Sequence, residues 1–97
     1  MLQVIDMCAA LNPEEKTVQA IMILQRVAED TGVPRNIRRA ANEAIKMLQR
    51  KDLSPGLRAA NAIGILDEVV TDPNMPLFAR TAIWQAVSLL EQIKDQL

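Results

Sequence analysis

The sequence predicts an all-α protein: a four-helix up-and-down bundle made of two 42-residue helical-hairpin repeats, preceded by a short N-terminal helix. Three observations lead to this prediction. The chain matches itself at an offset of 42 residues, apolar residues recur at helical spacing in four segments, and the composition is 49% hydrophobic but only 2% aromatic. Such a composition favours an aliphatic core between closely packed helices. At 97 residues, the chain is expected to form one domain, residues 1–97.

Identical residues at corresponding positions define the two copies, residues 12–51 and 54–97. In the first half of each copy, Ala20, Ile21, Ile23, Leu24, Val27 and Asp30 correspond to Ala62, Ile63, Ile65, Leu66, Val69 and Asp72. In the second half, Pro34, Arg38, Ala40, Ala44 and Leu48 correspond to Pro76, Arg80, Ala82, Ala86 and Leu90. The period and the pattern of residues 34–41 are also similar to those of HEAT repeats. Two copies make a poor solenoid, because each repeat buries its face only on its neighbours, so we favour a closed bundle.

The first element, residues 1–11, carries apolar residues at helical spacing. These are Met1, Val4, Ile5, Cys8 and Leu11. We expect a short helix that packs on Val18 and Met22; the alternative is an arm that docks on another subunit. The segment lacks a basic region and contains Asp6, which argues against a secretory signal peptide.

The first helix of each copy has a clear start signal. Asn12 and Ser54 are good N-cap residues, and each is followed by proline at the first helical position. The helices are expected to end near Asp30 and Asp72. Their predicted core faces are Thr17, Ala20, Ile21, Leu24, Val27 and Ala28, and Ala59, Ala62, Ile63, Leu66, Val69 and Val70.

The second helix of each copy follows a turn and is expected to begin at Pro34 or Pro76. Asp30 and Asp72 are interpreted as structural, bonding free N–H groups at the start of the next helix, with Arg38 and Arg80 reaching back to them. The predicted core faces are Ile37, Ala41, Ala44, Ile45 and Leu48, and Ala79, Ala82, Ile83, Ala86, Leu90, Ile93 and Leu97.

The outward faces of the second helices differ between the copies. The first carries Arg35, Arg39, Asn42 and Lys46, with Arg50 one turn further on, whereas the second carries Leu77, Thr81, Trp84 and Ser88. The apolar stripe predicts a site for another protein or a second copy, because tryptophan is enriched at binding hot spots; alternatively, Trp84 folds over Leu77 and Phe78 as part of the structure. The basic stripe is interpreted as a solvated face, with RNA phosphates as the alternative ligand.

No catalytic, cofactor or metal site is predicted. The chain has no histidine, which removes the usual acid–base group at neutral pH, and Cys8 is its only cysteine. The net charge of −1 does not favour nucleic acid, and no apolar run approaches the roughly 20 residues of a transmembrane helix. A single cysteine cannot form a disulfide within the chain, which fits a reducing compartment such as the cytoplasm. We therefore expect a non-enzymatic cytoplasmic protein.

Residues of the second copy resemble the signature of a known family. They are residues 65–68, 72–77, 79–81, 83–84 and 88–91, with residues 33–41 matching the motif of the first copy. In these residues, the chain resembles uncharacterised protein family 0147, a small archaeal family. The resemblance covers roughly residues 14–97. It implies a four-helix bundle and an archaeal, cytoplasmic source, adds weight to Asp72, Pro76, Arg80 and Trp84, and implies no activity.

Overall fold

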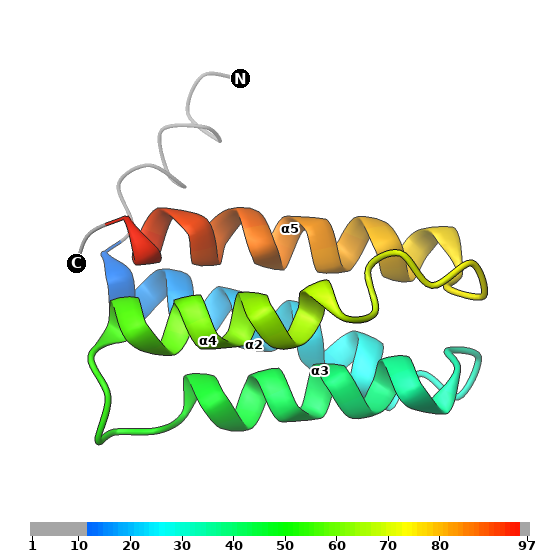
Figure 1. Cartoon of the computed structure of the whole chain (residues 1–97), viewed down its shortest axis with the longest axis horizontal. Helices are drawn as coiled ribbons and strands as arrows, with labels where there is room; N and C mark the ends of the chain where they lie inside the picture. Colours follow the sequence, from blue (N-terminus) through cyan, green and yellow to red (C-terminus); the bar gives the residue numbers. More distant parts are fainter. Residues whose placement is uncertain (1–11, 96–97) are drawn as a thin grey trace.

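The computed structural model describes residues 12–95 and folds them into four helices. They are α2 (Pro13–Glu29), α3 (Arg35–Leu48), α4 (Pro55–Asp67) and α5 (Leu77–Lys94). Loops at alternate ends connect neighbouring helices, which therefore run antiparallel (Figure 1). The predicted all-α fold with four helices is confirmed, and residues 12–95 contain no strand. The predicted helix within residues 1–11 lies outside the described residues.

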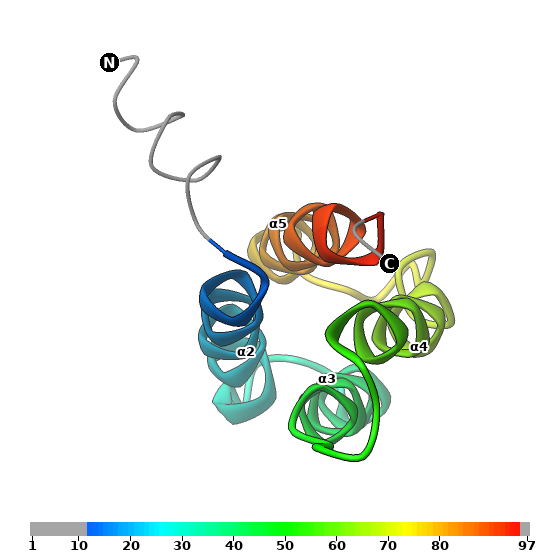
Figure 2. The same cartoon turned by 90° about the vertical axis from the view of Figure 1, so that its left-hand side faces the viewer.

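The helices form a closed ring rather than an open solenoid. Each helix packs against the next in sequence, and α5 returns to pack against α2, as the end-on view in Figure 2 shows. The ring leaves each helix one inward face and one outward face. No helix of residues 12–95 has both the length and the apolarity that a membrane crossing requires.

The core consists of aliphatic side chains and many alanines, as the helical spacing predicted. Fully buried alanines occur on every helix: Ala20 on α2, Ala41 and Ala44 on α3, Ala59 and Ala62 on α4, and Ala79 and Ala86 on α5. Ile21, Ala28, Val70 and Ala82 were expected in the core but are only half-buried at its edges. Val33 and Met75, which lie in the two turns, are buried and close one end of the core.

The helices begin in two different ways. The Asn12 side chain accepts the N–H of Glu15 at 2.8 Å, and the Glu15 side chain accepts the N–H of Asn12, which makes a capping box at the start of α2. Ser54 caps α4 through the N–H of Leu57. Pro34 and Pro76 were expected to be the first residues of α3 and α5. They are instead the N-caps of these helices, and no side chain caps either helix.

Helix α4 ends earlier than its counterpart α2. Helix α4 has 13 residues, whereas α2 has 17. The prediction that this helix ends near Asp72 is therefore wrong. Beyond Asp67 the backbone continues in tight turns, such as the bond from the N–H of Val69 to the carbonyl of Leu66 at 3.1 Å. Val69, Val70 and Thr71 are β-branched and disfavour a helix, whereas the matching residues 27–29 of α2 are Val, Ala and Glu.

Candidate functional site

The outward face of α5 carries an apolar stripe, the α5 stripe, which we define as Leu77, Thr81, Trp84 and Ser88. Helix α5 buries Ala79, Ile83, Ala86, Leu90 and Ile93, so residues about half a turn away from them point outward. Leu77 is 77% exposed and Trp84 is 59% exposed. Thr81 and Ser88 are also exposed. All four residues therefore lie together on one accessible face, as their spacing predicted.

The exposure of Trp84 bears on the alternative interpretation, in which this side chain folds over its neighbours as part of the structure. Phe78 is 53% exposed, and Leu77 and Trp84 are more exposed still. These side chains consequently do not form a buried apolar cap on the bundle. The large apolar residues on this face remain in contact with water, and an exposed apolar patch is typical of a binding surface.

The α5 stripe is also free of charge. Arg80 is the only charged residue between Leu77 and Ser88. Its guanidinium is turned to the loop between α4 and α5, where it donates to the carbonyls of Val70 and Asp72. The exposed part of this helix surface is therefore apolar or neutral and polar.

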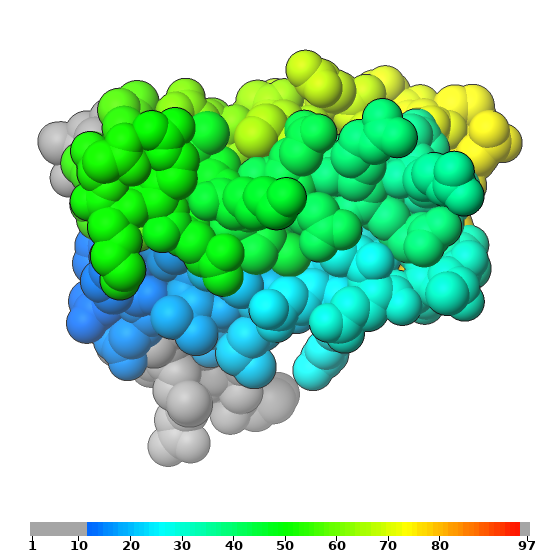
Figure 3. All heavy atoms as spheres, turned by 90° about the horizontal axis from the view of Figure 1, so that it is seen from below, coloured from blue at the N-terminus to red at the C-terminus, as the bar shows by residue number. Residues whose placement is uncertain are grey.

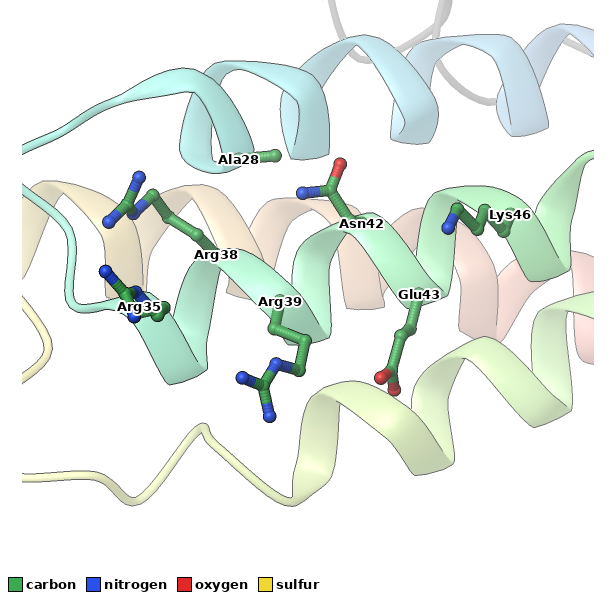
Figure 4. Close-up of a pocket in the computed structure, with 7 residues that line it drawn as sticks. All are labelled: Ala28, Arg35, Arg38, Arg39, Asn42, Glu43 and Lys46. Carbon is green, nitrogen blue, oxygen red and sulfur yellow. The ribbon is translucent and has the colours of Figure 1, made fainter.

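A basic groove runs between α2 and α3, which lie side by side on the face seen in Figure 3. Its volume is about 580 Å³, and it is lined by Ala28, Arg35, Arg38, Arg39, Asn42, Glu43 and Lys46. Figure 4 shows Asn42 pointing from α3 towards α2, whereas Arg39 and Glu43 extend towards α4. The residues predicted as a basic stripe, Arg35, Arg39, Asn42 and Lys46, thus all line this groove.

Two of the cations predicted to bind RNA have acidic neighbours. Arg50 forms a salt bridge with Asp52, and this hydrogen bond lowers the pKa of Asp52 and raises the pKa of Arg50. On the α4 side, Arg39 lines a second groove together with Glu43 and Glu68. The local positive charge is therefore smaller than the sequence pattern indicated.

The predicted contacts between the turn aspartates and the arginines need correction. Arg38 was expected to reach Asp30, but its Nε donates to the carbonyl of Val33 at 2.9 Å. Arg80 does contact Asp72, but through the backbone carbonyl, at 3.0 Å, and not through the carboxylate. Carbonyls at helix ends and in turns have few backbone donors, and a guanidinium supplies one to each of these two. The Asp72 carbonyl also accepts the N–H of Met75 at 3.2 Å.

The aspartates instead shape the loops in which they lie. The carboxylate of Asp30 accepts the N–H of Gly32, and that of Asp72 accepts the N–H of Asn74, both at 2.8 Å. In each loop the aspartate side chain accepts the N–H of the residue two positions later, which forms a turn within the loop. Neither carboxylate caps the next helix. The carboxylate of Asp72 also accepts the side-chain amide of Asn36 at 2.8 Å, which connects α3 to the loop before α5. This hydrogen bond and that from Asn74 lower the pKa of Asp72.

Arg58 has a structural role that the sequence interpretation missed. Its side chain is 12% exposed and donates to the carbonyl of Leu48 at the end of α3 and to Glu14 on α2, at 3.1 and 3.2 Å. It therefore connects three helices at one end of the bundle. The only available signal was that Arg58 and Lys16 correspond at the offset of 42 residues, and Lys16 is buried as well.

The outward side of α2 carries a second, smaller apolar area. Val18 and Met22 are exposed there, and they line a hollow of about 430 Å³. The segment expected to cover them, residues 1–11, lies outside the described part of the chain. Within residues 12–95, no three histidine, cysteine or carboxylate side chains gather into a group able to hold a metal ion.

Comparison with known proteins shows close relatives without an assigned role. The sequence profile of "Uncharacterised protein family (UPF0147)" matches residues 5–93. A UPF0147 protein of the archaeon Sulfurisphaera tokodaii is 56% identical over 92% of this chain and 100% of its own length. The crystal structure of the unknown function protein MMP1188 has a TM-score of 0.80 and 44% identity, covering 84% of this chain and 92% of its own. A UPF0147 protein from Thermoplasma acidophilum has a TM-score of 0.77 at 30% identity, covering 82% and 94% of the two chains.

Proposed function

We propose that this chain, which belongs to the uncharacterised protein family UPF0147, is a non-catalytic interaction module that binds protein through the α5 stripe. The observation that carries the proposal is the exposure of Trp84, at 59%, on a face whose counterpart on α3 is basic. A tryptophan supplies a large, rigid contact area and is the residue most enriched at interface hot spots. Its position at the middle of a helix face is suited to docking against another helix or a flat surface.

The energetic argument rests on the apolar area that remains in water. At about 25 cal/mol per Å² of apolar surface, burying the exposed parts of Trp84 and Leu77 contributes on the order of 4 kcal/mol of favourable free energy to binding. That gain is large enough to make the two side chains anchors of a moderate interface. Thr81 and Ser88 are small and lie between and beside the anchors, so they allow a partner to approach closely.

The absence of enzymatic activity and a cytoplasmic location are part of the same proposal. The chain contains no histidine, and its single cysteine is not accompanied by an imidazole base. A single cysteine also suits a reducing compartment. The partner is proposed to be another protein or a second copy of the chain.

The fluorescence of Trp84 tests this function directly, because the chain has one tryptophan and no tyrosine. We expect red-shifted emission in the free monomer and a blue shift as the partner covers the side chain, with light scattering on the same samples. Trp84→Ala is expected to abolish the association, whereas Gln85→Ala, an exposed neighbour outside the stripe, should leave it intact. The proposal fails if Trp84→Ala changes neither the mass nor the binding of any partner.

A second candidate function is RNA binding in the basic groove. The observation that favours it is the gathering of Arg35, Arg38 and Lys46 around a groove of about 580 Å³. Double-stranded RNA bound there should lose affinity steeply as salt increases, since phosphate contacts release counterions. Arg35→Gln with Lys46→Gln should weaken binding, and Arg50→Gln, whose guanidinium already pairs with Asp52, should not. No binding at low salt would exclude this candidate.

A further inference from the structure

The order of side-chain sizes along the α5 stripe suggests what covers it. The stripe reads large, small, large, small: Leu77, Thr81, Trp84 and Ser88. Steps of four, three and four residues keep these positions in one row along the helix. The same row is exposed to solvent, as described above.

From this row we infer that the α5 stripe pairs with the α5 stripe of a second copy, in antiparallel orientation about a two-fold axis. The inference rests on the proposed function and names its partner. In this arrangement, Leu77 lies level with Ser88 of the second copy and Thr81 lies level with Trp84. Each large side chain thus faces a small one. A parallel pair would place leucine against leucine and tryptophan against tryptophan.

The charge distribution supports self-association through α5 rather than through α3. The exposed residues from Leu77 to Ser88 are uncharged, so two copies bring no like charges together across the axis. The outward face of α3 carries Arg35, Arg39 and Lys46, and two copies of that face would repel each other. Among the outward faces of α3 and α5, the neutral one is therefore suited to contact with itself.

The length of the stripe sets the expected strength of the dimer. From Leu77 to Ser88 a helix rises about 16 Å at 1.5 Å per residue, which gives a contact smaller than a standard interface of about 1,600 Å². Interfaces of this size are typical of transient association. The dimer is consequently expected to appear in light scattering as the concentration rises from micromolar to millimolar.

Cysteine cross-linking tests the register of the pair, in a Cys8→Ser background of the full chain. Across the axis, the two copies of position 81 are offset by about 4.5 Å along the helix, and the two copies of position 77 by about 16 Å. Under mild oxidation, Thr81→Cys should therefore cross-link to itself. Leu77→Cys alone and Ser88→Cys alone should not, but an equimolar mixture of the two should form a mixed dimer. Gln25→Cys, exposed on α2, controls for random collisions.

The possible results separate this inference from the proposed function. A monomer at every concentration, with Trp84 still required for a different protein partner, overturns the dimer and leaves the interaction module intact. Self-cross-linking of Leu77→Cys overturns the antiparallel register. A dimer that survives Trp84→Ala and forms none of the predicted cross-links overturns pairing through the α5 stripe. The interaction module is overturned as well if Trp84→Ala also leaves the binding of every other partner unchanged. Doubled mass with cross-links from Thr81→Cys and from the mixed pair, but not from Gln25→Cys, supports the inference.

Discussion

At the scale of single residues, hydrogen bonds to backbone groups decide what the charged side chains do. Arg58 donates to the carbonyl of Leu48 at the end of α3, and Arg80 donates to the carbonyl of Val70 in the loop after α4. Carbonyls at the end of a helix and just beyond it have no intrahelical partner, so an arginine that reaches them replaces a missing donor. The carboxylate of Asp72 accepts hydrogen bonds from Asn36 on α3 and from Asn74 in its own loop, and these favour its ionised form.

Asn36→Ala is expected to raise the pKa of Asp72 towards the ordinary value for aspartate, because it removes the main hydrogen bond to the carboxylate. In the native protein this pKa is lowered on folding. The ionised Asp72 carboxylate therefore stabilises the fold at a pH above its pKa in the unfolded chain, which is about 3.9. This stabilisation is lost as the pH falls through the lower pKa of the folded state. Carboxyl resonances followed by NMR during acid titration measure the shift, and acid unfolding should become less dependent on this group. Asn42→Ala, on the same helix, should leave the Asp72 titration unchanged.

At the scale of elements, local composition sets where each helix ends. Helix α2 continues to Glu29, whereas α4 ends at Asp67. Gly64 lies three residues before this end, and the β-branched residues 69–71 follow shortly after it. Gly64 lies inside α4 with an ordinary backbone conformation, and a Cβ atom added there meets no atom within 4 Å. Gly32, in the loop after α2, is different, because a Cβ atom there would lie 3.1 Å from the carboxylate of Asp30.

Gly64→Ala is expected to stabilise the protein by about 0.5–1 kcal/mol, because alanine restricts the unfolded chain and suits the helix interior. Denaturant unfolding followed by circular dichroism measures the change. Gly32→Ala is the matched comparison. It should give no such gain, since the Asp30 carboxylate has to move to make room. Equal stabilisation by both substitutions would contradict the role assigned to the loop contact.

At the scale of the whole molecule, close packing of alanine faces holds the four-helix ring together. Ala20, Ala44, Ala62 and Ala86, one on each helix, are fully buried. Small side chains at these positions let the helix axes approach, while larger residues such as Leu24, Ile37, Leu66 and Ile83 fill the space between them. The ring leaves α5 with an outward face that no other described helix covers.

Ala44→Leu is expected to destabilise the bundle by about 1–3 kcal/mol, because the larger side chain forces α3 away from its neighbours. Glu43→Leu, an exposed change on the same helix, should alter the free energy of unfolding by less than about 0.5 kcal/mol. Thermal or denaturant unfolding of the two variants provides the test. A similar small effect at both positions would mean that the core around Ala44 is less tightly packed than the structure indicates.

The sequence by itself determined the four helices, their inward faces and the position of the α5 stripe. All of these follow from residue spacing within one segment, because the helical period places residues three and four apart on the same side. The tertiary structure alone decided which groups the arginines reach, that Trp84 stays exposed, and that Arg39 also lines a groove with Glu43 and Glu68. These features depend on contacts with other helices and loops, as in the bond between Asn36 and Asp72. No local spacing encodes such contacts, because long polar side chains bind whichever free carbonyl or carboxylate the fold brings within reach.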